Sequence, residues 1–160
     1  MTTATLQAKV DDFLGQKRIA VAGVSRHANH HPVGNLIYQR LKSTGHEVFP
    51  VNPSMSTFEG DPCYPDLQSI PGGVDGAVII TRPETTERIA RDCAEAGVRR
   101  VWMHSSLGQG SSVSEDAVDF CTERGMTVIA GACPMMYAGD VDLSHKCMRW
   151  VLGLTGSLPT

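Results

Sequence analysis

Short apolar runs alternate with helix-like segments along this chain, and this alternation restricts the fold more than any other feature. Runs typical of buried strands begin near residues 19, 47, 76, 100 and 127. Between them, apolar residues recur at the spacing of a helix face, and glycines act as stop signals. Strict alternation favours a parallel sheet with right-handed crossovers and helices on both faces. We therefore predict a single α/β domain with a Rossmann-like, doubly wound, five-stranded parallel sheet.

The chain of 160 residues suits one domain with its own core. We predict an N-terminal helical extension over residues 1–17, the main domain over 18–153 and a flexible tail over 154–160. The Pro- and Gly-rich stretch over 54–73 predicts an irregular connection with at most one helical turn. The final helix, expected near residues 143–152, is predicted to turn three side chains inward: Cys147, Trp150 and Val151.

Charge and cysteine content exclude several classes of protein. Lys and Arg number 14 and Asp and Glu number 17, which gives a net charge of −3 without long runs of one sign. No broad basic surface is expected for a nucleic acid or an anionic membrane, and no apolar run approaches membrane-spanning length. The N-terminus lacks a signal-peptide pattern. Five cysteines without a Cys-x-x-Cys pair argue against a disulfide scaffold and favour the reducing cytoplasm.

The carboxyl ends of the predicted strands mark the candidate site. In an open parallel sheet, the loops at these ends converge beside the point where strand order reverses, which predicts a ligand cleft. The candidate site residues lie on five such loops: Gly23, Val24, Ser25 and Arg26; Val51, Asn52 and Pro53; Thr81, Arg82 and Pro83; Met103, His104 and Ser105; Cys133 and Pro134.

The first of these loops favours an anionic ligand. Gly23 lets backbone amides approach an anion, and the next helix points its N-terminus toward the same place. The loop lacks the further glycines of a dinucleotide fingerprint, and Asn52 stands where an NAD site usually has an acidic residue. Arg26 and Arg82 would hold phosphate oxygens of a diphosphate or a 3′-phosphate. A plain turn with solvent-exposed arginines is the alternative.

No reaction centre or metal site is predicted. The loop that holds His27, His30 and His31 lacks a nearby Cys, Asp or Glu to complete a zinc site, so it is expected to cover the ligand. His104 is expected to line the cleft or to be a satisfied surface histidine. Cys133 is either a nucleophile or a small buried residue. A P-loop motif is absent from the sequence.

Taken in order, several segments resemble the CoA-binding protein family, whose fold matches the N-terminal domain of the succinyl-CoA synthetase alpha subunit. The resemblance spans roughly residues 12–150 and is strongest over 45–67. The matching segments are Ile19–Ser25, Gly45–Pro53, Gly60–Leu67, Thr81–Pro83, Val101–Met103 and Ala132–Pro134.

The resemblance implies coenzyme A or an acyl-CoA as the ligand. It assigns the nucleotide and phosphate contact to residues 23–26 and the wall of the adenosine site to residues 51–53, with 81–83 adjoining. Residues 103–105 would line the route of the pantetheine arm, with 133–134 nearby.

The synthetase carries a phosphorylated histidine in a second domain, and this sequence shows no counterpart, so ligase activity is not carried over. We therefore predict a non-enzymatic or regulatory CoA-binding module. Two alternatives stay open: an acyl-CoA-dependent enzyme that uses Cys133 or His104, and an NAD(P)-binding sensor. Apolar surface around Trp150 would support a homodimer.

Overall fold

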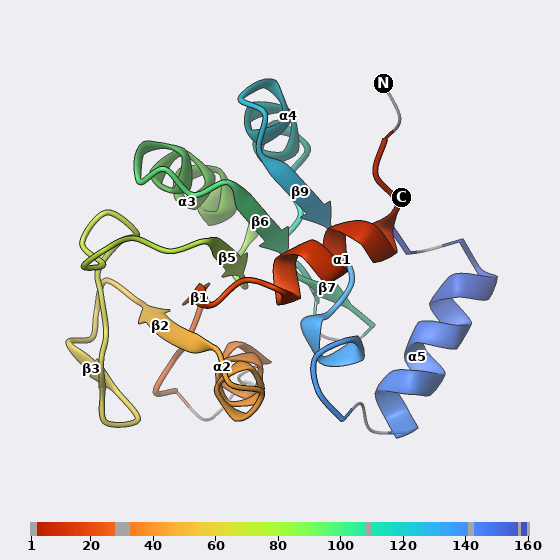
Figure 1. Ribbon diagram of the computed structural model, residues 1–160, viewed down its shortest axis with the longest axis horizontal. Helices are drawn as coiled ribbons and strands as arrows, with labels where there is room; N and C mark the ends of the chain where they lie inside the picture. Colours follow the sequence, from red (N-terminus) through yellow and green to blue (C-terminus); the bar gives the residue numbers. More distant parts are fainter. Residues whose placement is uncertain (1–2, 28–32, 108–109, 141–142, 157, 160) are drawn as a thin grey trace.

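Five parallel strands form the central sheet in the order β2-β1-β5-β6-β9 (Figure 1). The structure is a computed structural model that describes residues 3–27, 33–107, 110–140, 143–156 and 158–159. The sheet strands are β1 (Arg18–Ala22), β2 (Glu47–Val51), β5 (Gly76–Ile79), β6 (Arg100–Met103) and β9 (Thr127–Ala130). The helices are α1 (Leu6–Leu14), α2 (Val33–Ser43), α3 (Pro83–Glu95), α4 (Glu115–Glu123), the 3-10 helix η1 (Pro134–Met136) and α5 (Leu143–Leu154).

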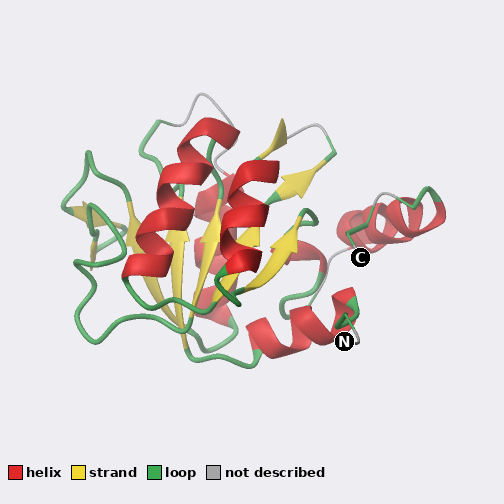
Figure 2. Ribbon diagram, turned by 90° about the horizontal axis from the view of Figure 1, so that it is seen from above, coloured by secondary structure: helices red, strands yellow, loops and turns green. Residues whose placement is uncertain are grey.

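The predicted Rossmann-like sheet is confirmed. Each strand begins within one residue of its expected start. The apolar runs of β1 and β5 are buried almost throughout because helices cover both faces of the sheet. α1 and α2 pack on one face with a core around Trp102, whereas α3 and α4 pack on the other around Met103. Figure 2 shows α3 and α4 lying over strands that all run in one direction.

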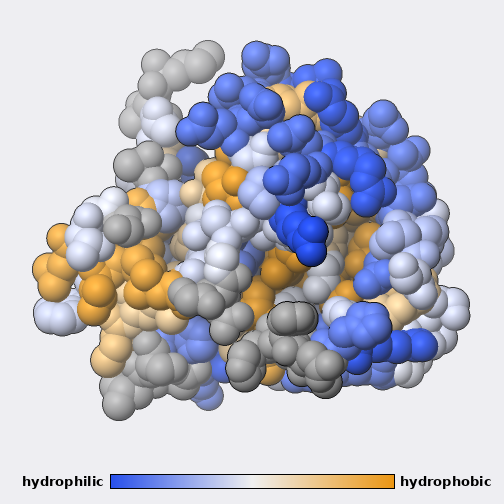
Figure 3. Space-filling model, turned by 180° about the vertical axis from the view of Figure 1, so that it is seen from behind, coloured by the Kyte–Doolittle hydropathy of each residue, from blue (hydrophilic) through white to orange (hydrophobic). Residues whose placement is uncertain are grey.

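The α5 helix turns a different face inward from the one expected. Met148 and Leu152 pack against the core, and Leu152 is 8% exposed. Cys147 is exposed, and Trp150 and Val151 are 68% and 41% exposed. Residues four apart share a helix face, so Met148 and Leu152 face the core together. The three residues predicted to face inward therefore lie on the outer side of the helix. Figure 3 shows the resulting hydrophobic surface over α5 as an orange area at its left edge.

The two ends of the chain both contact the core. The N-terminal helix α1 packs through Val10 and Phe13. At the other end, Leu154 is the last residue of α5, and Leu158 packs against the core cluster.

The connection over 54–73 was predicted to be irregular with at most one helical turn, and it contains a small antiparallel hairpin. Its strands are β3 (Thr57–Phe58) and β4 (Asp61–Pro62). Leu67 and Ile70 are buried and anchor the following segment on the α3 side of the sheet. A second hairpin, β7 (Ser105–Ser106) with β8 (Gly110–Ser111), follows β6.

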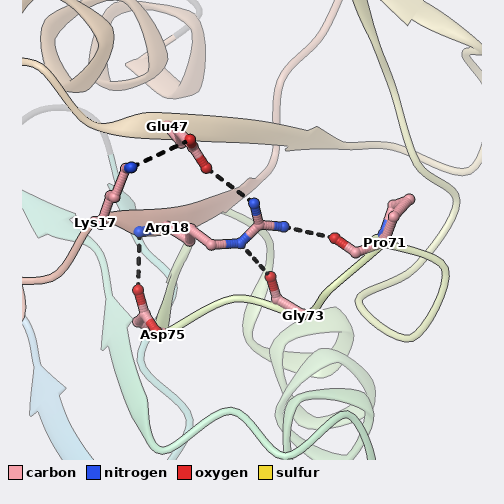
Figure 4. Close-up of polar contacts among 6 residues, drawn as sticks. All are labelled: Lys17, Arg18, Glu47, Pro71, Gly73 and Asp75. Atoms are coloured by element: carbon pink, nitrogen blue, oxygen red, sulfur yellow. Dashed lines mark hydrogen bonds and ion pairs between the residues drawn. The ribbon is translucent and has the colours of Figure 1, made fainter.

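Arg18 ties the amino ends of the strands together, at the edge opposite the candidate site (Figure 4). Its Nε donates to the carbonyl of Gly73 at 2.8 Å, and its Nη1 and Nη2 bond Glu47 at 2.9 Å and the Pro71 carbonyl at 2.6 Å. Its backbone amide donates to Asp75 at 2.9 Å. These bonds connect β1, β2 and the turn before β5 at this edge of the sheet.

Candidate functional site

Strand order reverses between β1 and β5. The chain leaves β1 toward β2 on one side, whereas β5 is followed by β6 and β9 on the other. Ile80 donates its amide to the carbonyl of Ala22 at 2.7 Å, so the loops after β1 and β5 leave the sheet side by side. In open α/β sheets a ligand crevice forms at such a switch point.

A groove of about 960 Å³ opens at this point and runs along α3. Figure 3 views the molecule from behind and shows a hollow with hydrophobic residues inside it. The groove is lined by residues from the loops after β1, β2 and β5, from the segment around Leu67 and from α3: Ala22, Gly23, Val51, Asn52, Pro53, Ser54, Pro65, Asp66, Leu67, Thr81, Arg82, Thr85, Arg88, Ile89, Arg91, Asp92 and Glu95.

The groove brings together part of the predicted set and leaves the rest outside. The predicted residues that line it are Gly23, Val51, Asn52, Pro53, Thr81 and Arg82. The predicted residues outside its lining are Val24, Ser25, Arg26, Pro83, Met103, His104, Ser105, Cys133 and Pro134. Met103 shows the reason, since it is completely buried in the core beneath α3 and α4.

Two glycines allow the close packing behind the groove. Gly23 has φ +132°, and a Cβ there would lie 2.1 Å from the carbonyl oxygen of Ile80. A Cβ on Gly34, in the first turn of α2, would lie 2.4 Å from the carbonyl oxygen of Gly23. Gly23 was predicted as a site residue and Gly34 was not. The sequence did carry a signal for Gly34, because it is a glycine in the first turn of a predicted helix and follows soon after the glycine that ends a predicted strand.

Side-chain amides hold the first loop in shape. Asn35 accepts a hydrogen bond from the Ser25 amide at 2.9 Å and donates to the Ser25 carbonyl at 2.7 Å. Asn52 donates to the carbonyl of Val24 at 2.8 Å, and the His27 amide donates to Ser25 Oγ at 3.1 Å. The amides of Ser25 and His27 therefore have partners within the chain. Asn35 was not predicted from the sequence, and His30 and His31 lie outside the described residues.

The arginines of the predicted site differ in their surroundings. Arg26 donates through Nη2 to the carbonyl of Thr57 at 2.8 Å, so its guanidinium bridges the first loop to the β3–β4 hairpin. Arg82 is exposed, occupies the N-cap position of α3, and makes no side-chain capping bond there. Arg88 also lines the groove, six residues further along α3, and was not predicted.

His104 and Cys133 are both in the interior. Both are 1% exposed. Burial lowers the pKa of His104 to about 4 and raises the pKa of Cys133 to about 11. A satisfied surface histidine was the wrong expectation, because His104 Nε2 is buried and has no hydrogen-bond partner in the described part of the chain. Cys133 is a thiol at neutral pH, which makes it a poor nucleophile.

The burial of His104 predicts an acid-sensitive fold. Its pKa of about 4 is below the ordinary 6.5, so the unfolded chain binds a proton first and stability falls as pH drops from about 6.5 toward 4. We expect a loss of about 2 kcal/mol in the free energy of unfolding between pH 7 and pH 5 from this group. Urea unfolding at both pH values checks this, with His104→Leu as the control. The same pH dependence in both proteins would contradict the assignment.

The comparisons with known proteins decide the family. A family described as the CoA binding domain matches residues 17–138, which is most of the chain and includes every strand of the sheet. The chain belongs to the CoA-binding domain family. No described helix is long and apolar enough to cross a membrane, and no group of three metal-ligating side chains occurs among the described residues.

Relatives of this chain include a short protein that it matches over most of its length and parts of larger enzymes. YneT of Bacillus subtilis, an uncharacterized protein, is 27% identical over 128 residues, which are 79% of this chain and 90% of YneT. The alpha subunit of an ADP-forming acetate–CoA ligase II from Pyrococcus furiosus is 28% identical over 78% of this chain. The chain covers only 28% of that subunit.

Solved structures show the same fold. A hypothetical protein from Pyrococcus furiosus has a TM-score of 0.62 and 29% identity over 72% of this chain and 93% of its own. A dinucleotide-forming acetyl-coenzyme A synthetase from Ca. Korarchaeum cryptofilum, in complex with phosphate and ADP, has a TM-score of 0.62 and 27% identity. That match covers 76% of this chain and 27% of the synthetase chain.

Proposed function

We propose that this chain binds coenzyme A or an acyl-CoA in the groove along α3 and acts as a binding or regulatory module. The observation that carries the proposal is the position of the groove at the switch point between β1 and β5, where open α/β sheets hold their nucleotides. Membership of the CoA-binding domain family supports the class of ligand.

The residues in the groove fit the parts of such a ligand. Pro53, Leu67 and Ile89 supply apolar walls for a flat adenine ring. Arg82 supplies a guanidinium for phosphate oxygens at the N-terminus of α3, where the helix dipole also favours negative charge. The volume of about 960 Å³ lies at the upper end of ordinary ligand pockets, which suits a nucleotide of this size.

The two alternatives receive less support from the site. An enzyme that attacks an acyl-CoA with Cys133 needs a thiolate, and burial raises the pKa of this thiol to about 11. An NAD(P) sensor needs a group for the ribose hydroxyls at the end of β2, and Asn52 there already donates its side-chain amide to Val24.

Calorimetric titration with coenzyme A, acetyl-CoA, NAD and NADPH tests the ligand. We expect saturable binding of coenzyme A and at least tenfold weaker binding of both nicotinamide nucleotides. Ser54→Trp tests the location, because Ser54 is exposed and lines the groove, so an indole there would occupy part of the space for the ligand. We expect Ser54→Trp to weaken coenzyme A binding at least tenfold.

The matched control is Ser43→Trp, which places the same indole on an exposed residue at the end of α2, away from the groove. A wild-type protein that prefers NAD would overturn the proposed ligand. Equal binding by both tryptophan variants would overturn the proposed location.

A further inference from the structure

Two guanidinium groups line the groove from the amino-terminal half of α3. Arg82 stands at the N-cap, and Arg88 lies about 9 Å further along the helix axis. Both residues are exposed, and within the described part of the chain neither guanidinium forms an ion pair or a hydrogen bond. These two cations of the groove therefore have no anion of the protein to neutralise them.

The carboxylates of the same groove are bound elsewhere. Asp92 accepts a hydrogen bond from the Leu67 amide at 2.7 Å and another from Gln68 at 2.9 Å, one on each oxygen. Glu95 also accepts a bond from Gln68, at 3.0 Å. Asp92 is four residues after Arg88, a spacing that often gives an ion pair on a helix, yet the two do not pair. Arg91 also lines the groove, but its guanidinium lies over the ring of Phe120, 4.7 Å from the centroid. Arg82 and Arg88 are therefore the groove arginines without a partner in the described part of the chain.

The separation of the two arginines matters for the kind of ligand. The two phosphorus atoms of a diphosphate share one bridging oxygen, so a single diphosphate lies at one place in the groove. Arg82, beside Thr81 and the N-terminus of α3, suits that group. Arg88 is then left for a separate anionic group of the same ligand, one that stands at a distance from the diphosphate.

We propose that Arg88 binds a phosphomonoester on the ribose and makes the groove select nucleotides that carry a 3′-phosphate in addition to a 5′-diphosphate. This inference rests on the proposed function and deepens it. The sequence predicted that Arg26 and Arg82 hold a diphosphate or a 3′-phosphate. Here Arg82 keeps the diphosphate and Arg88 takes the 3′-phosphate, because the guanidinium of Arg26 bonds Thr57 and does not line the groove.

Calorimetry at fixed ionic strength tests this selectivity. Coenzyme A, dephospho-CoA, adenosine 3′,5′-bisphosphate and AMP are titrated into the wild type, Arg88→Gln, Arg26→Gln and Arg99→Gln. Arg99 is an exposed arginine outside the groove, so its variant removes the same charge without touching the site. We expect the wild type to prefer the 3′-phosphorylated member of each pair about tenfold, as a charge-assisted Arg–phosphate contact implies. Arg88→Gln should reduce this preference to less than about twofold, and the other two variants should keep it.

Different results separate this inference from the proposed function. A wild type that binds both members of each pair equally overturns the role of Arg88, even if coenzyme A binds tightly. Loss of the preference in Arg26→Gln and not in Arg88→Gln also overturns it. In a third outcome, the wild type does not bind coenzyme A but still prefers adenosine 3′,5′-bisphosphate to AMP, and Arg88→Gln loses this preference. That outcome supports the role of Arg88 and overturns only the proposed function. Absence of binding by all four compounds overturns both. Far-UV circular dichroism confirms that each variant is folded.

Discussion

Replacing Trp102 with alanine is expected to lower the free energy of unfolding by about 3–5 kcal/mol, the usual cost of removing a large buried aromatic side chain. Trp102 is completely buried at the centre of β6. Its ring meets that of Phe13 edge to face at a centroid distance of 5.4 Å, which joins α1 to the sheet. Its Nε1 donates to the carbonyl of Gly131 at 3.0 Å, directly after β9. One side chain therefore contributes both to the core and to the loop at the end of β9.

Urea unfolding followed by far-UV circular dichroism measures this loss. Trp102→Phe is the matched control, since it keeps an aromatic ring against Phe13 and removes the N–H group and part of the volume. We expect the control to lose about half as much stability as Trp102→Ala. A loss below about 1 kcal/mol in Trp102→Ala would show that the packing around β6 differs from that described.

Replacing Gly23 with alanine is expected to lower the free energy of unfolding by about 3 kcal/mol or more. Two causes combine at this position. The φ of +132° disfavours any residue with a Cβ, and this Cβ would lie 2.1 Å from the carbonyl oxygen of Ile80. Backbone atoms cannot rotate away as a flexible side chain does, so β1 and the loop after β5 would have to separate. We expect the separation to deform the wall of the groove as well.

Gly45→Ala is the matched control for this prediction. Gly45 also has a positive φ, +93°, but a Cβ there would meet nothing within 4 Å. Its variant therefore carries the backbone strain alone, about 1–2 kcal/mol. Chemical denaturation of both variants isolates the contribution of the close approach. Equal losses in Gly23→Ala and Gly45→Ala would mean that the loops after β1 and β5 do not pack as tightly as described.

Part of the groove could be predicted because parallel strands bring their carboxyl ends to one edge. Gly23, Asn52 and Thr81 lie far apart in the sequence, and each lies within two residues of the end of a strand. Once the strands were identified, their convergence followed from topology. The resemblance to the CoA-binding family then supplied the class of ligand, which the alternation of strands and helices could not.

Arg88 was missed because it lies inside a helix and no strand end points to it. Whether a residue in the middle of α3 lines the groove depends on how the helix crosses the sheet, which the spacing of apolar residues does not specify. The outward face of α5 was missed for a related reason. Its apolar residues surround most of the helix, so periodicity alone did not distinguish Met148 and Leu152 from Trp150 and Val151.

The sequence by itself determined the strands, their order of appearance, the positions of the turns and the edge at which ligand-binding loops gather, because these depend on local patterns and on the short range of chain connections. Only the tertiary structure decided which side of the sheet each residue at that edge faces. Trp102 and Met103 are neighbours in β6, yet successive side chains of a strand point to opposite faces. Trp102 therefore packs with α1 and α2, whereas Met103 packs with α3 and α4 and is removed from the groove.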